Sequence, residues 1–360
     1  MILFIFYNEI LINYMNDNII DEKNQLILEP LNDFQLDSFT DSYISDGFCI
    51  FSSINDILYL IHSTELKSII AYDLNNNQKI VEIKNAHEDY ISSFKHILDQ
   101  LQKKDYLMSV SYDSNCLKLW DIKNFECLCY IKDINPDGFL FCAHFLLENQ
   151  KKQINLFILT TNCNFYHDSQ PIKKYDLKGK EIDKINNSEG LDVLYLIDFI
   201  DPFSKKQFLL AGTKRSIISF DLEKNKIYHS YQDQTAGMHC NIIINSKRED
   251  GIIQMIESCT DGKIRIWDFH KMKLLQIINV SNTWLYGMCL WDNNIIFVGD
   301  GDKNIKLINL SRGEITKELY GNKERITTIK KIRLNNFGEC LITQEYLKGG
   351  IKLWRISLKQ

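Results

Sequence analysis

The chain contains few of the residues that interrupt regular structure: only 4 of its 360 residues are proline and 16 are glycine. This composition argues against a low-complexity or disordered protein. Long apolar runs are also missing, and no segment approaches the roughly 20 apolar residues that a membrane-spanning helix needs. Because 45% of the residues are hydrophobic, we expect a folded protein with a buried core.

A strong net charge is likewise missing. The formal charge is −5 at pH 7, so the chain has no global positive field to attract phosphate groups. Nucleic acid and anionic membranes are therefore disfavoured as partners, and other proteins are favoured. No small-molecule substrate is implied.

Cysteine occurs ten times but never as C-x-x-C. The closest pair, Cys127 and Cys129, has no histidine beside it. We therefore expect buried free thiols, which pack as small hydrophobes, in a reducing compartment such as the cytoplasm or the nucleus.

The N-terminus lacks the features of a signal peptide. Met1–Tyr7 is apolar, but Asn8 and Glu9 interrupt it, and it has neither a basic leading segment nor a small-residue cleavage site. We expect residues 1–24 to form a tail, partly disordered, that precedes the folded domain. A packing tail and an upstream extension with initiation at Met15 are the two interpretations.

A repeated strand ending is the main positive signal. S-Y-D-S-N-C-L-K-L-W-D at Ser111–Asp121 and S-C-T-D-G-K-I-R-I-W-D at Ser258–Asp268 share a turn, an alternating apolar and basic segment, and a terminal Trp-Asp. Degraded copies bring the number of units to seven, spaced by 41 to 55 residues. The units end at Asp73, Asp121, Asp176, Asp221, Asp268, Asn309 and Arg355.

This period is typical of a four-stranded propeller blade. The second unit, for example, reads as four short alternating strands joined by polar turns. They are Ile91–His96, Asp105–Ser111, Cys116–Asp121 and Cys127–Ile131. We predict an all-β fold, a single seven-bladed β-propeller of four-stranded antiparallel blades over residues 25–360.

The last unit has only three evident strands, and an open ring would leave two sheet edges exposed. We expect an N-terminal strand to close the ring. Phe34–Phe39 alternates apolar and polar residues and is the predicted closing strand; Gln25–Glu29 is the competing candidate.

These strand endings resemble the WD-repeat family over roughly residues 34–357. The resemblance implies a buried polar network in each regular blade, in which a histidine binds a turn aspartate and meets a Ser/Thr hydroxyl and the Trp. In the second unit Ser109 or Ser111 would supply the hydroxyl, and in the fifth Ser258 or Thr260. The other implied members are His87, Asp113 and Trp120, then His239, Asp261 and Trp267, and Asp302 of the sixth unit.

Ser, His and Asp together also occur in hydrolase triads. Here they occupy repeat positions and no G-x-S-x-G elbow accompanies them, so we predict no catalytic residues. The remaining histidines are isolated, and glycine-rich phosphate loops are missing, so we predict no metal site and no cofactor.

The predicted function is a non-catalytic scaffold or adaptor that binds a protein or peptide through the loops of one propeller face. Aromatic and arginine residues beside those loops are the expected anchors. They are Tyr90, Tyr112, Arg215, Trp284 and Arg325. The alternatives are a substrate-recognition subunit of a ubiquitin ligase, a lipid-binding propeller and a propeller enzyme; neither Trp-Asp-x-Arg nor Phe-Arg-Arg-Gly, which mark the first two, occurs.

Overall fold

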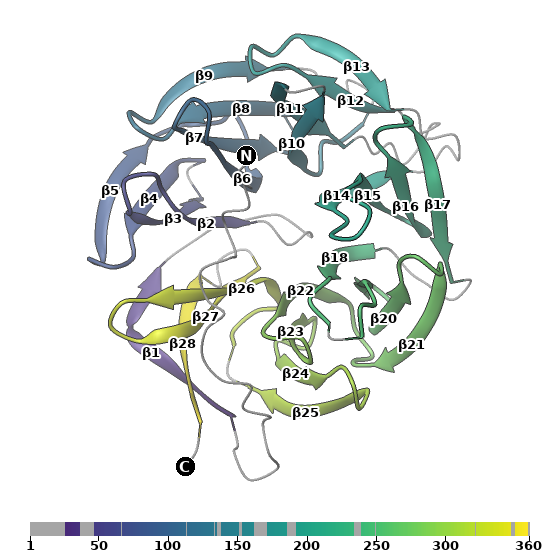
Figure 1. Cartoon of the computed structure of the whole chain (residues 1–360). Helices are drawn as coiled ribbons and strands as arrows, with labels where there is room; N and C mark the ends of the chain where they lie inside the picture. Colours follow the sequence, from purple (N-terminus) through teal and green to yellow (C-terminus); the bar gives the residue numbers. More distant parts are fainter. Residues whose placement is uncertain are drawn as a thin grey trace, which may run out of the picture.

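The fold is a ring of seven four-stranded antiparallel sheets, seen along its axis in Figure 1. The computed structural model describes residues 26–36, 47–65, 67–112, 114–132, 134, 138–150, 153–161, 171–185, 192–233, 239–248, 250–320, 322–346 and 350–358. Within these residues all regular secondary structure is β-strand. The predicted seven-bladed, all-β propeller is confirmed.

Each of blades 1 to 3 is built from four consecutive strands, ordered from the central channel outward. Blade 1 contains β2 (Phe48–Ser52), β3 (Leu58–Ser63), β4 (Ile69–Asp73) and β5 (Gln78–Ile83). Blade 2 contains β6 (Ile91–Asp99), β7 (Lys104–Ser111), β8 (Cys116–Asp121) and β9 (Glu126–Ile131). Blade 3 contains β10 (Ala143–Gln150), β11 (Gln153–Thr160), β12 (Ile172–Tyr175) and β13 (Glu181–Ile185).

Blades 4 to 6 repeat this order. Blade 4 contains β14 (Val193–Ile200), β15 (Gln207–Thr213), β16 (Ser216–Asp221) and β17 (Lys226–Gln232). Blade 5 contains β18 (His239–Asn245), β19 (Gln254–Cys259), β20 (Lys263–Asp268) and β21 (Lys273–Asn279). Blade 6 contains β22 (Leu285–Leu290), β23 (Ile295–Asp300), β24 (Ile305–Asn309) and β25 (Glu314–Leu319).

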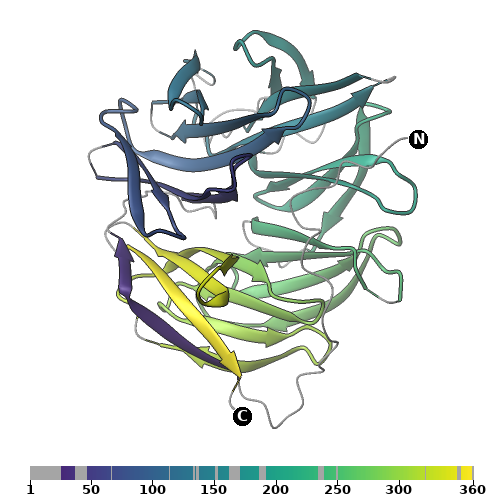
Figure 2. The same cartoon turned by 60° about the vertical axis from the view of Figure 1, so that its left-hand side comes forward.

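Blade 7 joins the two ends of the chain. Its inner strands are β26 (Ile326–Leu334), β27 (Gly338–Glu345) and β28 (Ile351–Leu358), and its outer strand is β1 (Leu26–Leu36). Figure 2 shows β1, in purple, beside the last yellow strand. The ring is therefore closed by an N-terminal strand, as predicted.

The choice between the two closing segments needs correction. Leu26–Pro30 pairs continuously with β28, so the competing candidate supplies most of the contact. Of the segment predicted first, Gln35 and Leu36 pair with β28, and residues 37–39 lie outside the described residues. The register shifts between Pro30 and Gln35. This bulge lets one strand use parts of both alternating segments.

The recurrent Asp at the end of the third strand has a local role. The Oδ1 atom of Asp121 accepts a hydrogen bond from Lys123 N at 2.9 Å, and Asp268 does the same for Lys271 N at 2.9 Å. Such a side chain satisfies the backbone of the tight turn that leads to the fourth strand. The third strands end at Asp73, Asp121, Tyr175, Asp221, Asp268 and Asn309 in blades 1 to 6.

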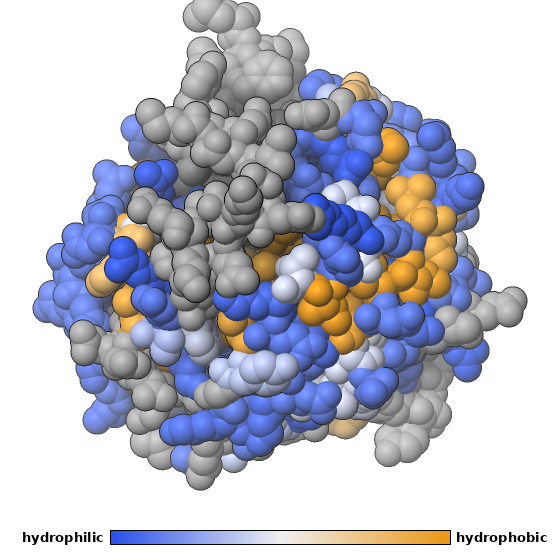
Figure 3. Space-filling model, turned by 90° about the horizontal axis from the view of Figure 1, so that it is seen from below, coloured by the Kyte–Doolittle hydropathy of each residue, from blue (hydrophilic) through white to orange (hydrophobic). Residues whose placement is uncertain are grey.

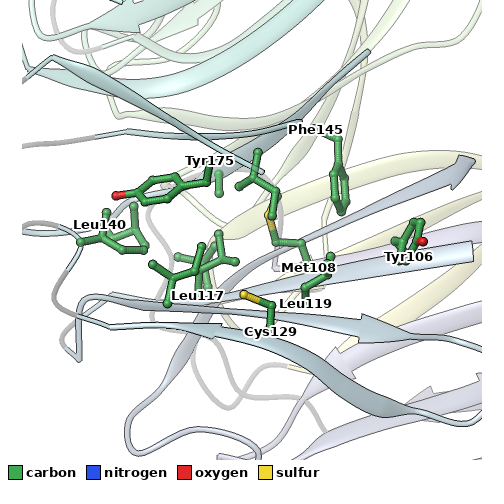
Figure 4. Close-up of a cluster of buried hydrophobic side chains, with 13 residues drawn as sticks. Tyr106, Met108, Leu117, Leu119, Cys129, Leu140, Phe145 and Tyr175 are labelled. Atoms are coloured by element: carbon green, nitrogen blue, oxygen red, sulfur yellow. The ribbon is translucent and has the colours of Figure 1, made fainter. Parts of the chain in front are cut away.

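The core lies between neighbouring blades. Figure 4 shows one such cluster, in which Met108 and Leu119 of blade 2 face Phe145 and Tyr175 of blade 3. Each sheet is covered on both faces, so its inner strands are almost continuously buried, as in β7 and β15. Seven interlocked sheets of this kind make a rigid support for the loops on either face.

Candidate functional site

The chain direction places all five predicted anchors on one face of the ring. Neighbouring strands are antiparallel, so the turn between the second and third strands lies at the same end as the segment that leads into the next blade. We call this end the linker face. Tyr90, Trp284 and Arg325 immediately precede first strands, and Tyr112 and Arg215 follow second strands.

Two of these anchors, Trp284 and Arg325, contact the same residue, Tyr286, across blades 6 and 7. The guanidinium carbon of Arg325 lies 3.6 Å from the ring centroid of Tyr346 and 5.3 Å from that of Tyr286. Arg325 Nη1 donates to the Tyr286 hydroxyl at 3.0 Å. The ring of Trp284 lies 6.0 Å from that of Tyr286. We call Trp284, Tyr286, Arg325 and Tyr346 the aromatic–arginine cluster.

The cluster combines a buried base with an exposed tip. Tyr286 is buried, Arg325 and Tyr346 are half-buried, and Trp284 is 41% exposed. The backbone N–H of Tyr346 also donates to the Arg325 carbonyl at 2.9 Å. Stacking and hydrogen bonding hold the guanidinium in one orientation, so a partner would meet a preorganised surface.

Sequence reasoning missed Tyr286 and Tyr346, although the repeat contains a signal for the second. Ile91 pairs with Ser111 in blade 2 and Ile326 pairs with Glu345 in blade 7. Tyr346 therefore occupies the repeat position of Tyr112, which was predicted.

Tyr90 lies beside a hollow on the linker face. Lys67 Nζ is 5.5 Å from the Tyr90 ring centroid and donates to the Glu88 carbonyl at 2.6 Å. The hollow has a volume of about 670 Å³. Its lining has both signs of charge and comprises Glu65, Lys67, Asn85, His87, Glu88 and Lys118.

The other two anchors lie apart from these features. Tyr112 is half-buried, stacked on Phe139 at 4.7 Å and edge-on to Phe141 at 5.0 Å, so it forms part of the packing between blades. Arg215 is exposed, and its backbone N–H donates to Thr213 Oγ1 at 3.2 Å.

In five blades a basic residue near the start of the third strand hydrogen-bonds to the segment that enters the same blade on the linker face. It stands two positions before a Trp or Tyr in blades 2, 3, 5 and 7, and two positions before Ile308 in blade 6. Lys118 Nζ donates to the Ala86 carbonyl at 2.6 Å, and Lys306 Nζ to the Val280 carbonyl at 2.7 Å. In each case the acceptor lies in the segment that enters the blade of the basic residue. The same relation holds for Lys173, Arg265 and Lys352.

In blade 2 the structure brings together three residues of the implied network. His87 Nε2 lies 2.7 Å from Ser109 Oγ, and the Trp120 indole N–H donates to the same oxygen at 2.8 Å. Ser111 is not part of it and accepts instead from Ser114. Asp113 lies outside the described residues.

Cys116 is a neighbour of His87 that sequence reasoning missed. Its Sγ lies 3.3 Å from His87 Nδ1, a pairing that resembles a cysteine-protease dyad. Burial lowers the pKa of His87 to about 3, and burial raises the pKa of the Cys116 thiol. Both groups are neutral at pH 7, so no reactive thiolate–imidazolium pair forms.

In blade 5 the expected hydroxyl is replaced by a carboxylate. The Trp267 indole N–H donates to Glu257 Oε1 at 3.2 Å, not to Ser258 or Thr260. Glu257 pairs with Arg265 in the register that Ser109 has with Lys118. Because strand side chains alternate, Ser258, one residue further, points to the other face of the sheet.

Asp261 and Arg265 form the rest of the polar group in blade 5. Arg265 is fully buried; its Nη2 lies 2.5 Å from Asp261 Oδ2 and its Nε 2.6 Å from Asp233 Oδ2. Asp261 thus binds an arginine, and the side chain of His239 lies outside the described residues.

Blades 6 and 7 have different polar groups at the positions of this network. Asp302 lies at the surface and accepts from Ser281 at 3.4 Å, whereas Asp300 is the buried acid and lies 3.1 Å from Lys306 Nζ. In blade 7 the Trp354 indole N–H donates to Thr343 Oγ1 at 2.9 Å, a pair that sequence reasoning missed.

Among the described residues no three His, Cys, Asp or Glu side chains converge to hold a metal ion. The part of the chain that the structure describes contains no helix long and apolar enough to cross a membrane. Of the eight cysteine side chains that the structure describes, all but Cys127 are buried.

The ring of blades and the geometry of their strand ends define the class: a seven-bladed β-propeller built to present loops. With Trp120-Asp121 and Trp267-Asp268 ending third strands, the chain resembles the WD-repeat β-propellers. No family model matches it. It is similar to the U3 small nucleolar RNA-associated protein 21 homolog of Schizosaccharomyces pombe, with 24% identity over 100 residues. The match spans 28% of this chain and 11% of that protein.

Proposed function

We propose that the protein is a non-catalytic scaffold or adaptor that binds a protein partner through its linker face. The observation that carries the proposal is the aromatic–arginine cluster. Exposed Trp and stacked Arg side chains on a rigid base are the residue types that contribute most binding energy at protein interfaces. The Tyr90 hollow offers a second contact on the same face.

The similarity to the fission-yeast protein supports a place in a multiprotein assembly. That protein is named for its association with U3 small nucleolar RNA. Our proposal is a protein partner inside the cell, in the cytoplasm or the nucleus, and any RNA in the same complex would reach this chain through proteins. RNase treatment of the purified complex separates the two arrangements.

The test is affinity purification from native cells with quantitative mass spectrometry, comparing Trp284→Ala with Phe337→Ala. The two side chains are 41% and 44% exposed, but Phe337 lies on the opposite face, in the turn between β26 and β27. We expect Trp284→Ala to weaken partner recovery by about thirtyfold in affinity, a loss of about 2 kcal/mol.

Phe337→Ala should recover the partner at the wild-type level. Equal recovery by both variants, with RNase present, would contradict the proposed surface. A thermal melt of each variant controls for folding, since replacing an exposed aromatic residue should change stability by only about 0.5 kcal/mol.

A further inference from the structure

The outer strand of blade 5 is an open sheet edge with an exposed apolar row. β21 pairs with β20, and no other strand of the described part of the chain pairs with it. The backbone N–H and C=O groups on its outer side therefore point to the rim of the ring. Leu275 and Ile277 alternate along it and are 44% and 41% exposed. Hydrophobic patches gather on the right-hand side of Figure 3, the side of the ring on which β21 lies in Figure 1.

Most of the other outer strands carry features that discourage pairing at an edge. Strands β5, β13 and β25 each contain at least two charged residues, and β1 contains a proline and a register shift. Natural proteins blunt sheet edges in these ways. Among the described side chains of the outer strands, only β21 has two exposed large aliphatic residues, and its single charge, Lys273, stands at its first position. The bulge between third and fourth strands recurs in blades 1 to 6, so it does not distinguish β21.

We propose that β21 pairs with β21 of a second copy of this chain, antiparallel and about a two-fold axis at Gln276. The strand is self-complementary in this register. Leu275 of each copy lies opposite Ile277 of the other, so both exposed rows are covered. Lysine does not face lysine, because Lys273 lies opposite Asn279. Cross-strand apolar pairs of this kind stabilise antiparallel sheets.

The charges beyond the strand favour the same register. Lys271 comes opposite Ser281 of the second copy, whose hydroxyl donates to its own Asp302 at 3.4 Å. Lys271, Lys273 and Asp302 are exposed, so the basic beginning of each strand meets the end that carries this acid. Lys271 also lies 3.6 Å from Asp268 in its own turn, whereas Lys273 makes no ion pair with the described residues. Exposed pairs add little stability, but they select the orientation of the second copy.

The shape of the ring leaves room for this contact. β21 lies on the rim, and the neighbouring blades point away from it around the ring (Figure 1). Two rings can therefore meet rim to rim with both linker faces free. A pairing of two seven-residue strands is small beside the roughly 1,600 Å² of a standard interface. We therefore expect a weak dimer that depends on concentration.

The test is sedimentation velocity of the full chain over a concentration series. We expect one transition from monomer to dimer without larger species, because a two-fold contact closes on itself. Leu275→Lys should weaken dimerisation by about tenfold or more, since the two-fold axis places the lysine in the interface twice. Thr316→Lys is the matched control, because Thr316 is exposed at the same repeat position in β25, and it should dimerise like the wild type. A monomer at every concentration, or equal weakening by both variants, would overturn the proposal.

A cysteine variant tests the register. Gln276→Cys places two cysteines opposite each other across the two-fold axis, at a Cα separation of about 4.5–5.5 Å that a disulfide allows. Under mild oxidation it should form a covalent dimer on a non-reducing gel, whereas the wild type and Thr316→Cys should remain monomeric. This result requires pairing at β21, so misfolding of Leu275→Lys could not explain it. Covalent dimer of Gln276→Cys no more abundant than in the wild type would contradict the proposed pairing.

Discussion

At the scale of the residue, the polar groups that suggested chemistry are arranged for structure. His87, Ser109 and Trp120 share one buried hydroxyl, and burial keeps both His87 and Cys116 neutral. A satisfied buried network rigidifies a sheet, whereas a half-satisfied one destabilises it. The indole N–H groups of Trp120, Trp267 and Trp354 donate to the same repeat position, which is Ser109, Glu257 or Thr343 according to the blade.

Replacing the strand-ending Trp tests this role. Trp120→Ala and Trp267→Ala should each lower the free energy of unfolding by roughly 3–5 kcal/mol, because each removes a large buried ring and leaves its hydrogen-bond partner unsatisfied. Urea denaturation followed by circular dichroism measures the change. Trp284→Ala is the matched control, and unchanged midpoints for the two buried positions would contradict the assigned role.

The pH dependence of stability tests the neutral state of His87. Its folded pKa, about 3, lies below the ordinary value of 6.5. The unfolded chain therefore takes up the proton first, and stability contributed by this group is present above pH 6.5 and lost as the pH falls toward 3. The loss should be on the order of a few kcal/mol.

His87→Gln should have a flatter stability curve between pH 6.5 and 4 than the wild type, although it is less stable at pH 7. Urea midpoints at a series of pH values give both curves. His96, whose pKa burial also lowers, remains in both proteins, so the difference between them isolates His87. Parallel curves would show that His87 is not buried in its neutral form.

At the scale of the element, a basic residue of the third strand hydrogen-bonds to the segment that enters the same blade in five of the blades. In blade 5 this residue is the fully buried Arg265. Arg265 contacts Asp233 and Asp261 directly and lies 3.9 Å from Glu257. This single cation therefore lies close to three acidic side chains at once.

Arg265→Met should lower the free energy of unfolding by roughly 3–5 kcal/mol, because it leaves buried carboxylates without their cation. Arg312→Met removes an exposed arginine 3.5 Å from Glu314 and should cost under about 1 kcal/mol. Thermal and urea unfolding of both variants make the comparison. Similar losses at the two positions would contradict the role given to Arg265.

Deletion of the closing strand is the corresponding test in blade 7. Removing residues 1–40 takes away all of β1 and leaves β28 as an open edge, so we expect aggregation or failure to fold. Removing residues 1–14 leaves β1 intact and should be tolerated. Size-exclusion chromatography distinguishes the outcomes, and a stable monomer of residues 41–360 would contradict the account of ring closure.

Features that depend on residues close together in the sequence could be predicted, whereas contacts between strands or blades could not. The strand-ending Trp-Asp is a local signal, so Trp120 and Trp267 could be placed in register from the sequence. Glu257 was missed because a carboxylate in a hydroxyl position depends on Arg265 opposite it. Tyr286 and Tyr346 were missed because their contact with Arg325 crosses between blades, and a bulge merged the two candidate closing segments.

At the scale of the whole molecule, the packed core lies between the blades and the proposed anchors lie on the linker face. The side of the ring seen in Figure 3 is largely hydrophilic, with hydrophobic patches gathered in its right-hand part. The linker face carries the aromatic–arginine cluster that we propose as the partner-binding surface. A rigid ring suits that proposal because it holds the loops of each face in fixed positions.

Cross-linking mass spectrometry of the purified complex, with an amine-reactive reagent, tests the central claim most directly. Lys303 and Lys323 lie on the linker face near the cluster, whereas Lys205 and Lys271 lie in turns on the opposite face. The account predicts that cross-links to the partner concentrate at Lys303 and Lys323 and are lost in Trp284→Ala. Partner cross-links concentrated at Lys205 and Lys271 would contradict it.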